Sequence, residues 1–221
     1  MKSTCAIVLL ALSCVCARAT VSFNISATEL RTADGASLMS LSGLVLLVAD
    51  TSNDGFSGLT AGAPLTVNSF LSGDDLILFR GDLFVESVPG LFTGTVNFPL
   101  GGHNLGTGDA VKLYWFPTLT LSSTTAAEGT TYGSYRSATG LDGSAPWVVP
   151  NDGSSAVELK FFTTGNNQGE PFGGGPASND PVLGWASQTV APVPEASNLI
   201  TAALALGLCA LRVTRGFCQK S

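Results

Sequence analysis

The chain has 221 residues, with 16 acidic and 10 basic side chains and a formal net charge of −6. This length suffices for one domain with its own core and short additional segments. Residues 20–190 carry fifteen acidic and five basic residues, a net charge of −10. That charge argues against binding to nucleic acid or to anionic lipid surfaces, because both need clustered lysine and arginine. All five cysteines lie outside residues 20–190, so no disulfide framework holds this part together.

The first 19 residues have the pattern of a secretory signal peptide. Lys2 precedes an apolar run from Cys5 to Cys16, and Ala17-Arg18-Ala19 gives the small-x-small sequence that signal peptidase recognises. The run has about 12 residues, fewer than the roughly 20 that span a bilayer. We therefore expect a signal helix at residues 1–19 that is cleaved after Ala19.

Residues 20–190 consist of short apolar stretches separated by turns rich in Gly, Asn and Asp. Val21, Phe23 and Ile25 alternate with polar residues, which is the period of a strand with one buried face. No sustained helical period occurs in this part. The pattern predicts an acidic all-β domain, an antiparallel β-sandwich or jelly roll, with a long loop at 164–181. Further strands are expected at residues 43–49, 75–79, 91–98, 110–116, 156–163 and 184–190.

The stretch Asp50-Thr51-Ser52-Asn53-Asp54-Gly55 follows the opening of a calcium loop. Oxygen-bearing side chains at Asp50, Ser52 and Asp54, followed by a glycine, have the spacing that surrounds a hard cation. Asp74 and Asp75 lie in a second turn and are candidates to complete the site. A full EF-hand loop is excluded, because an alanine stands where the bidentate glutamate belongs. Two interpretations remain: a calcium site, and a turn stabilised by its own side chains.

Aromatic residues offer a second candidate site, because flat rings stack on sugar rings. Neighbouring side chains on a strand point to opposite faces, so part of the run Tyr114-Trp115-Phe116 belongs to the core. A secreted carbohydrate-binding module is therefore an alternative function. Its candidate residues are Tyr114, Trp115, Trp147 and Trp185.

Catalytic chemistry has little support in the sequence. The single histidine, His103, lies in a turn, and without a cysteine in residues 20–190 the common zinc sites cannot form. No nucleophile elbow of the G-x-S-x-G type occurs. The paired carboxylates of a glycosidase stay open as an alternative, but most acidic residues here neighbour Gly, Asn or Ser, as turn residues do. We expect a protein that is not an enzyme.

The C-terminal segment, residues 191–221, combines a proline-rich linker, an apolar run and a basic end. The run from Leu199 to Leu211 predicts a hydrophobic helix that is shorter than a membrane span. Arg212 and Arg215 follow it and favour retention of that end in the cytoplasm. We therefore expect transient retention in the inner membrane. A single-pass membrane anchor and a GPI signal are the alternatives, although a GPI signal normally ends in its hydrophobic segment.

The sequence Val193-Pro194-Glu195-Ala196, with the apolar run and the arginines, resembles the PEP-CTERM sorting signal of exopolysaccharide-producing Gram-negative bacteria. Ala196 stands where that family usually has proline. The resemblance implies that exosortase, a membrane cysteine transpeptidase, recognises Pro194 and Glu195 and removes the tail. The order of VADTSNDGF, FLSGDD, LYWFP and YGSYR is also similar to the β-domains that often precede such tails. The resemblance thus implies an exported protein of the cell surface or extracellular matrix, associated with exopolysaccharide or biofilm.

Overall fold

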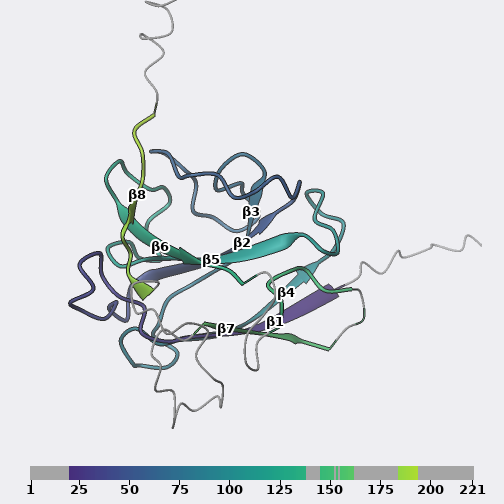
Figure 1. The fold of residues 1–221 in the computed structure, drawn as a ribbon, viewed down its shortest axis with the longest axis horizontal. Helices are drawn as coiled ribbons and strands as arrows, with labels where there is room; N and C mark the ends of the chain where they lie inside the picture. The colour runs from purple at the N-terminus through teal and green to yellow at the C-terminus, as the bar shows by residue number, and fades with distance from the viewer. Residues whose placement is uncertain (1–19, 138–144, 152, 154, 162–183, 194–221) are drawn as a thin grey trace, which may run out of the picture.

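The protein is all-β, with two sheets stacked face to face (Figure 1). The computed structural model describes residues 20–137, 145–151, 153, 155–161 and 184–193, and these residues form eight strands and no helix. One sheet has the order β4-β1-β7 and the other the order β3-β2-β5-β6-β8. The all-β prediction is confirmed, and the two stacked sheets are consistent with a sandwich. The strands are β1 (Thr20–Ala27), β2 (Leu44–Asp50), β3 (Asp75–Gly81), β4 (Phe92–Pro99), β5 (Ala110–Phe116), β6 (Thr131–Tyr135), β7 (Val157–Phe161) and β8 (Gln188–Thr189).

All strand pairings in the five-stranded sheet are antiparallel, whereas the three-stranded sheet has one antiparallel and one parallel pairing. β1 runs antiparallel to β4, with Phe23 opposite Val96, but parallel to β7, with Phe23 opposite Val157. The antiparallel sandwich expected from the sequence therefore contains one parallel pair at this edge. A parallel pair needs a crossover connection and not a hairpin. Strands β2 to β6 lie between β1 and β7 in the sequence, so the chain returns to β1 from the other sheet.

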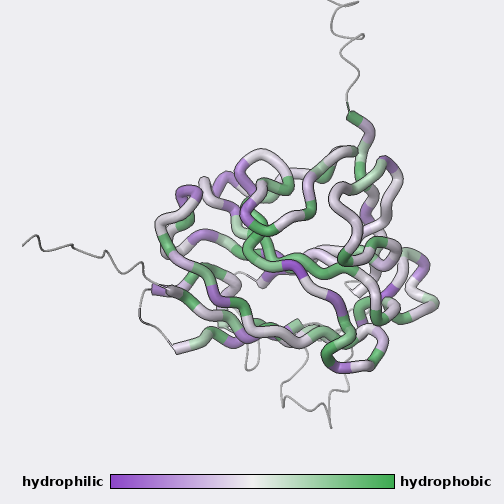
Figure 2. Tube along the Cα trace, turned by 180° about the vertical axis from the view of Figure 1, so that it is seen from behind, coloured by the Kyte–Doolittle hydropathy of each residue, from purple (hydrophilic) through white to green (hydrophobic). Residues whose placement is uncertain are grey.

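The main core lies between the sheets, and a second cluster lies on the outer face of the five-stranded sheet. On β2, Val45 and Leu47 belong to the main core, whereas Leu46 and Val48 belong to the outer cluster. Loop residues within 56–71 and 119–126 pack on that outer cluster. All seven residues of β2 are therefore buried, which explains the unbroken apolar run in this strand. In Figure 2 the hydrophobic stretches coincide largely with the strands that form the two layers, and many hydrophilic stretches lie in loops.

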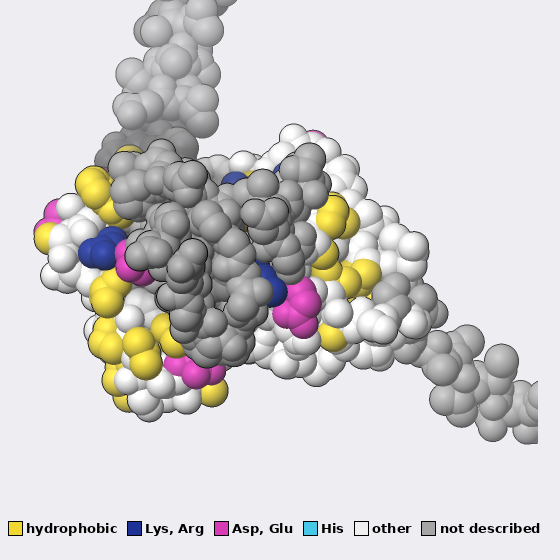
Figure 3. All heavy atoms as spheres, turned by 60° about the horizontal axis from the view of Figure 1, so that its bottom comes forward, with side chains coloured by type: hydrophobic (Ala, Val, Ile, Leu, Met, Phe, Trp, Pro, Cys, Tyr) yellow, Lys and Arg dark blue, Asp and Glu magenta, His cyan; other side chains and the backbone are white. Residues whose placement is uncertain are grey.

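The outer face of the three-stranded sheet is different, because its side chains are polar and reach the surface. Along β1 and β4 the buried and more exposed residues alternate over much of each strand, as expected for a sheet with one solvated face. Figure 3 views the molecule from this side. The outer face of the three-stranded sheet is thus polar and partly exposed, whereas the five-stranded sheet is covered on both faces.

Most strand positions follow the sequence pattern. β5 occupies the predicted residues 110–116, and β2, β3, β4 and β7 differ from their predicted ranges by one or two residues at an end. β8 covers only Gln188–Thr189, where the sequence predicts 184–190. β6 is not predicted, because Gly133 lies in its centre and glycine weakens the strand signal.

Candidate metal centre

Asp50, the last residue of β2, shapes the loop that follows it. Its side chain is buried, with 1% of its surface exposed. Oδ1 accepts hydrogen bonds from the backbone N–H groups of Ser52 (3.2 Å) and Asn53 (2.7 Å), and Oδ2 accepts one from Gly55 (2.8 Å). A carboxylate in this position holds the backbone in a turn. The turn that the sequence offers as one interpretation is therefore present, and it leaves the loop with a defined shape.

Asn53 fastens the same loop to β5. Its φ of 58° lies in the left-handed region, which asparagine tolerates better than most residues. Its Oδ1 accepts a hydrogen bond from the N–H of Ala110 (3.0 Å), and its Nδ2 donates to Oδ1 of Asp109 (3.1 Å). Asp109 is buried and also accepts a bond from the N–H of Gly106 (2.7 Å). The loop is thus held at both β2 and β5.

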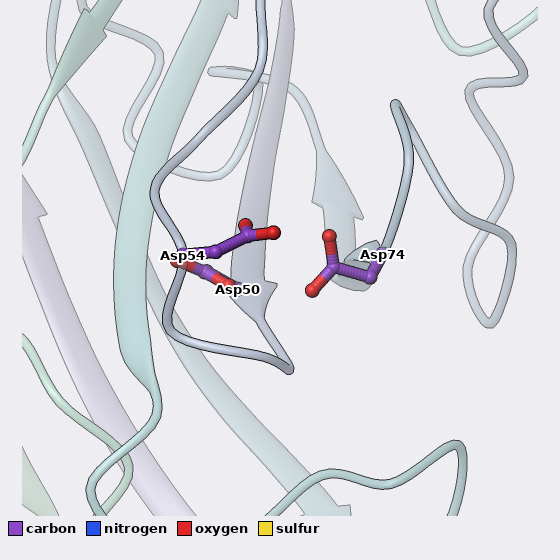
Figure 4. A group of neighbouring side chains, drawn as sticks. All are labelled: Asp50, Asp54 and Asp74. Carbon is purple, nitrogen blue, oxygen red and sulfur yellow. The ribbon is translucent and has the colours of Figure 1, made fainter.

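Three carboxylates from two loops converge beside this turn (Figure 4). Asp50 and Asp54 lie at the end of β2 and in the loop after it, and Asp74 lies immediately before β3. Each offers one oxygen, and these three oxygens lie within 4.8 Å of one another. Asp54 is exposed and Asp74 is half-buried, and the enclosed Oδ2 of Asp74 has no hydrogen-bond partner among the residues that the structure describes. Carboxylates this close repel one another, and a cation between them would offset that repulsion.

Asp75, the first residue of β3, extends the acidic group into the interior. It pairs with Asp50 across the β2–β3 ladder, so both side chains lie on the same face of the sheet. It is 1% exposed; its Oδ2 accepts a bond from the N–H of Ser57 (3.1 Å), whereas Oδ1 has no partner among the described residues. Burial, and then the charges of Asp50 and Asp74, raise the pKa of Asp75 to about 7. A buried oxygen without a partner is costly, although Asp75 is not one of the three residues whose oxygens converge within 4.8 Å.

The charges around the acidic group are only partly balanced. Burial lowers the pKa of Lys112 on β5, and the negative charges of Asp75 and Asp50 act in the opposite direction. The Nζ of Lys112 lies 4.3 Å from the ring centroid of Phe56, a cation–π contact. Hydrogen bonding with the Ser52 side chain lowers the pKa of Asp74, so this carboxylate is charged at neutral pH. Arg136 lies over the same Phe56 ring, 5.7 Å from its centroid. The acidic group is therefore accompanied by one partly desolvated lysine and a nearby arginine.

The structure places the five predicted metal ligands unequally. Asp50, Asp54 and Asp74 form the converging triad, and Asp75 lies beside Asp50 in the neighbouring strand. Ser52 is exposed and takes part through the turn and through its effect on Asp74. Asn53 and Asp109 support the loop and are not among the residues singled out from the sequence. Calcium binding itself stays a prediction.

The aromatic platform predicted from the sequence is wrong for three of its four residues. Trp115 and Trp147 have none of their surface exposed, and Tyr114 has 2%. Trp115 packs on Phe161, with ring centroids 5.6 Å apart, as part of the main core. These rings present no face on which a sugar can stack. Their apolar surface is used between the sheets and under the loops.

Trp185, the fourth candidate, is half-buried. Its indole lies against Gly35, where an added Cβ would come 2.1 Å from the ring. The backbone of Trp185 also forms a parallel bridge with Arg31. The ring therefore packs the turn at residues 31–37 against the segment at residues 184–193. His103, by contrast, lies exposed in a turn with a φ of 53°, as the sequence predicts.

Several predicted segments lie outside the described residues. These are the signal segment with Ala17 and Ala19, the loop at 164–181, and the tail from Pro194 onward, with Glu195, Ala196, Arg212 and Arg215. Val193 is described and is 59% exposed. No helix that could cross a membrane occurs in the described part of the chain. The proposals for these segments therefore rest on sequence.

Comparisons with protein-family models, with curated proteins and with solved structures found no match for this chain. The function is accordingly argued from the geometry above.

Proposed function

We propose that the chain is an exported, non-enzymatic protein of the cell surface or extracellular matrix, and that calcium cross-links its acidic loops. The observation that carries the calcium assignment is the convergence of Asp50, Asp54 and Asp74 within 4.8 Å. Asp74 adds a second observation, since its enclosed Oδ2 has no hydrogen-bond partner among the described residues. Ion binding would connect the loop after β2 to the loop before β3.

Calcium suits this group better than other common cations. The ligands are carboxylate oxygens, which hard cations prefer, and zinc would favour nitrogen and sulfur. Calcium accepts six to eight oxygens in a flexible arrangement, whereas magnesium demands a near-ideal octahedron. Backbone oxygens and water therefore complete the shell more readily around calcium. Extracellular calcium modules bind with a Kd of about 10⁻⁴ to 10⁻³ M, which fits a protein that works outside the cell.

A stabilising role follows from the composition. Residues 20–190 have a net charge of −10 and no cysteine, so neither a disulfide nor a balance of surface charge strengthens the fold. A divalent cation would lower the repulsion between Asp50, Asp54 and Asp74 and hold two loops together. Ligand binding to the folded state alone raises its stability.

The non-enzymatic assignment is proposed from the sequence, in which most acidic residues neighbour turn-forming residues. Glycoside hydrolysis needs two carboxyl groups about 5 to 10 Å apart across a substrate cleft. One depression in the described part of the chain is lined by residues of β3, β4 and the 101–105 turn, none of them acidic, and another by a single carboxylate, that of Glu158. The acidic triad lines neither of these depressions.

Export and sorting are proposed from the sequence of the two ends. The signal segment at 1–19 would direct the chain to signal peptidase, and Pro194-Glu195 with the apolar run and Arg212 and Arg215 would direct it to an exosortase-like enzyme. We propose that the released protein is associated with exopolysaccharide outside the cell. The intact mass of the protein recovered from the cell surface tests this part. A species that lacks both residues 1–19 and residues 199–221 is expected, and one that retains 199–221 would favour a simple membrane anchor.

Isothermal titration calorimetry of EDTA-treated protein tests the calcium assignment. We expect one saturable site for calcium and a much weaker response to magnesium. The D54N/D74N double variant, which removes two of the three converging charges, is expected to lose the calcium signal. Equal binding of the two cations, or equal calcium binding by the variant, would contradict the assignment.

A further inference from the structure

A hydrogen-bonded row of side chains crosses all three strands on the outer face of the β4-β1-β7 sheet. Asn24 of β1 donates from Nδ2 to Oε1 of Glu158 on β7 (2.7 Å), and its Oδ1 accepts a bond from Oγ1 of Thr95 on β4 (3.0 Å). The ladder register places Asn24 opposite both Thr95 and Glu158. Residues far apart in the sequence are thus held in fixed positions on one surface.

This row lines a shallow depression of about 420 Å³, a size typical of small-molecule sites. The segment between β3 and β4 contributes one apolar side chain, that of Val85, which lines the depression and is 79% exposed. Thr93 donates a hydrogen bond from Oγ1 to Oε1 of Glu86 and so fastens this segment to β4. The depression therefore combines an ordered polar floor with one exposed apolar side chain.

We propose that this depression binds a neutral sugar ring. Amide, hydroxyl and carboxylate groups offer both donors and acceptors to the hydroxyls of a sugar. The row uses Oε1 of Glu158, and within the described part of the chain no hydrogen bond occupies its Oε2. The exposed side chain of Val85 suits the apolar C–H groups of the same ring. Phe84 beside it is 56% exposed, and in Figure 3 hydrophobic side chains adjoin acidic ones on this face.

Charge distinguishes this ligand from the other small molecules that polar sites bind. Among the described residues the lining includes neither lysine nor arginine, although Lys160 of β7 is the ladder partner of Ser26, which lines the depression. A phosphate or carboxylate ligand would therefore face the carboxylate of Glu158 and would find no arginine to bind it. That carboxylate already accepts a bond from Asn24, and a lone carboxylate is a poor cation site. A neutral polyhydroxylated ligand is the class that these groups match.

The sugar site is independent of the calcium site and of the aromatic residues considered from the sequence. It lies on the three-stranded sheet, whereas Asp50 and Asp75 lie on the five-stranded one. Trp115 and Trp147 are buried between the sheets and take no part. The proposal therefore goes beyond the calcium-stabilised fold, and either can fail without the other.

Titration of the ¹⁵N- and ¹³C-methyl-labelled protein with cellotriose, maltotriose and mannotriose tests the site by NMR. At millimolar sugar we expect at least one trisaccharide to shift the side-chain amide of Asn24 and the methyl groups of Val85. N24A and V85S are expected to weaken that binding at least tenfold. N97A is the matched control, because Asn97 lies on the same face of β4, bonded to Ser22, but does not line the depression; it should bind as the wild type does.

Each other outcome would overturn the proposal. No shift at Asn24 or Val85 with any of the three sugars excludes a neutral sugar ring at this position. Equal sugar affinity of V85S and the wild type would also exclude a sugar ring at this position. This test holds even if N24A fails to fold, because Val85 is exposed and its replacement leaves the core intact. A trigalacturonate that binds more tightly than the neutral sugars would assign the depression to an acidic ligand. Repeating the titration in EDTA separates this result from the calcium site.

Discussion

Gly133 of β6 lies directly opposite Trp115 of β5 in the antiparallel ladder, and the indole occupies the space that a side chain at position 133 would need. A Cβ on Gly133 would come 2.1 Å from the Trp115 ring. The indole has none of its surface exposed and packs on Phe161 in the main core. The absence of a side chain at Gly133 on β6 therefore leaves room for the indole of Trp115 on the neighbouring strand β5.

Replacement of Gly133 should accordingly destabilise the fold. G133A forces Trp115 or the β5–β6 pairing to move, and overpacking of this kind typically costs about 1–3 kcal/mol. G102A is the matched control, because a Cβ at Gly102 meets nothing within 4 Å and its φ is not positive. Urea denaturation of both variants measures the difference. Equal free energies of unfolding for G133A and G102A would show that the core tolerates the change.

The two tryptophans that differ in burial should differ in their contribution to stability. Trp147 is fully buried and contacts Tyr135 edge-on, with ring centroids 5.4 Å apart, so W147A is expected to cost about 3–5 kcal/mol. Trp185 is half-buried, and W185A should cost clearly less. Thermal unfolding followed by circular dichroism measures both. A smaller loss for W147A than for W185A would contradict the assignment of Trp147 to the core.

Asn53 should be important for the loop through its side chain and not only through its backbone conformation. N53G keeps the positive φ accessible but removes the bonds to Ala110 and Asp109, whereas N53A removes the same bonds and also strains the backbone. We expect a loss of stability in both variants, with N53A the worse by about 1 kcal/mol. Chemical denaturation in EDTA measures it. Wild-type stability of N53G would mean that the two side-chain bonds contribute nothing.

Asp75 should make the calcium-free protein less stable as the pH rises. Its pKa is raised to about 7 in the folded state from an ordinary value of 3.8, so between these values the folded chain holds a proton that the unfolded chain has released. The free energy of unfolding therefore decreases as the pH increases through this window, and the contribution is lost above the folded pKa. Denaturation curves in EDTA at several pH values measure the slope.

The D75N variant should lack this part of the pH dependence, because its amide does not titrate. E128Q, which changes an exposed residue, should retain the wild-type slope. Calcium should also reduce the slope in the wild type, since a nearby cation favours the charged carboxylate. A D75N protein whose stability falls with pH as steeply as that of the wild type would assign the effect to another group.

The sequence predicts the strands well where the side-chain pattern is local. Val21, Phe23 and Ile25 alternate because β1 has one buried face, and the unbroken apolar run of β2 reflects burial on both faces. β6 escapes such reasoning, because its central Gly133 is explained only by Trp115 on a neighbouring strand. The parallel pairing of β1 with β7 is equally non-local and depends on how the chain crosses between the sheets.

The candidate sites show the same division. The oxygen-rich spacing that begins at the last residue of β2 and the acidic pair at the start of β3 identify Asp50, Asp54 and Asp74 from sequence. Their convergence depends on the β2–β3 ladder. The row formed by Asn24 and Glu158 is invisible in the sequence, because its members are contributed by separate strands. The prediction of an exposed aromatic platform is wrong for Trp115 and Trp147, because the residue type shows that a ring is present but not whether its face is exposed.

Thermal unfolding in EDTA and in saturating calcium tests the central claim most directly. At about 100 times its Kd, a ligand that binds only the folded state contributes about 2.7 kcal/mol, which corresponds to an increase in Tm of about 5–10 °C for a chain of this size. We predict that increase for the wild type and its absence in D54N/D74N, with magnesium having little effect. An unchanged Tm of the wild type between EDTA and calcium would mean that the acidic residues form only a turn and bind no calcium, and it would contradict the proposal.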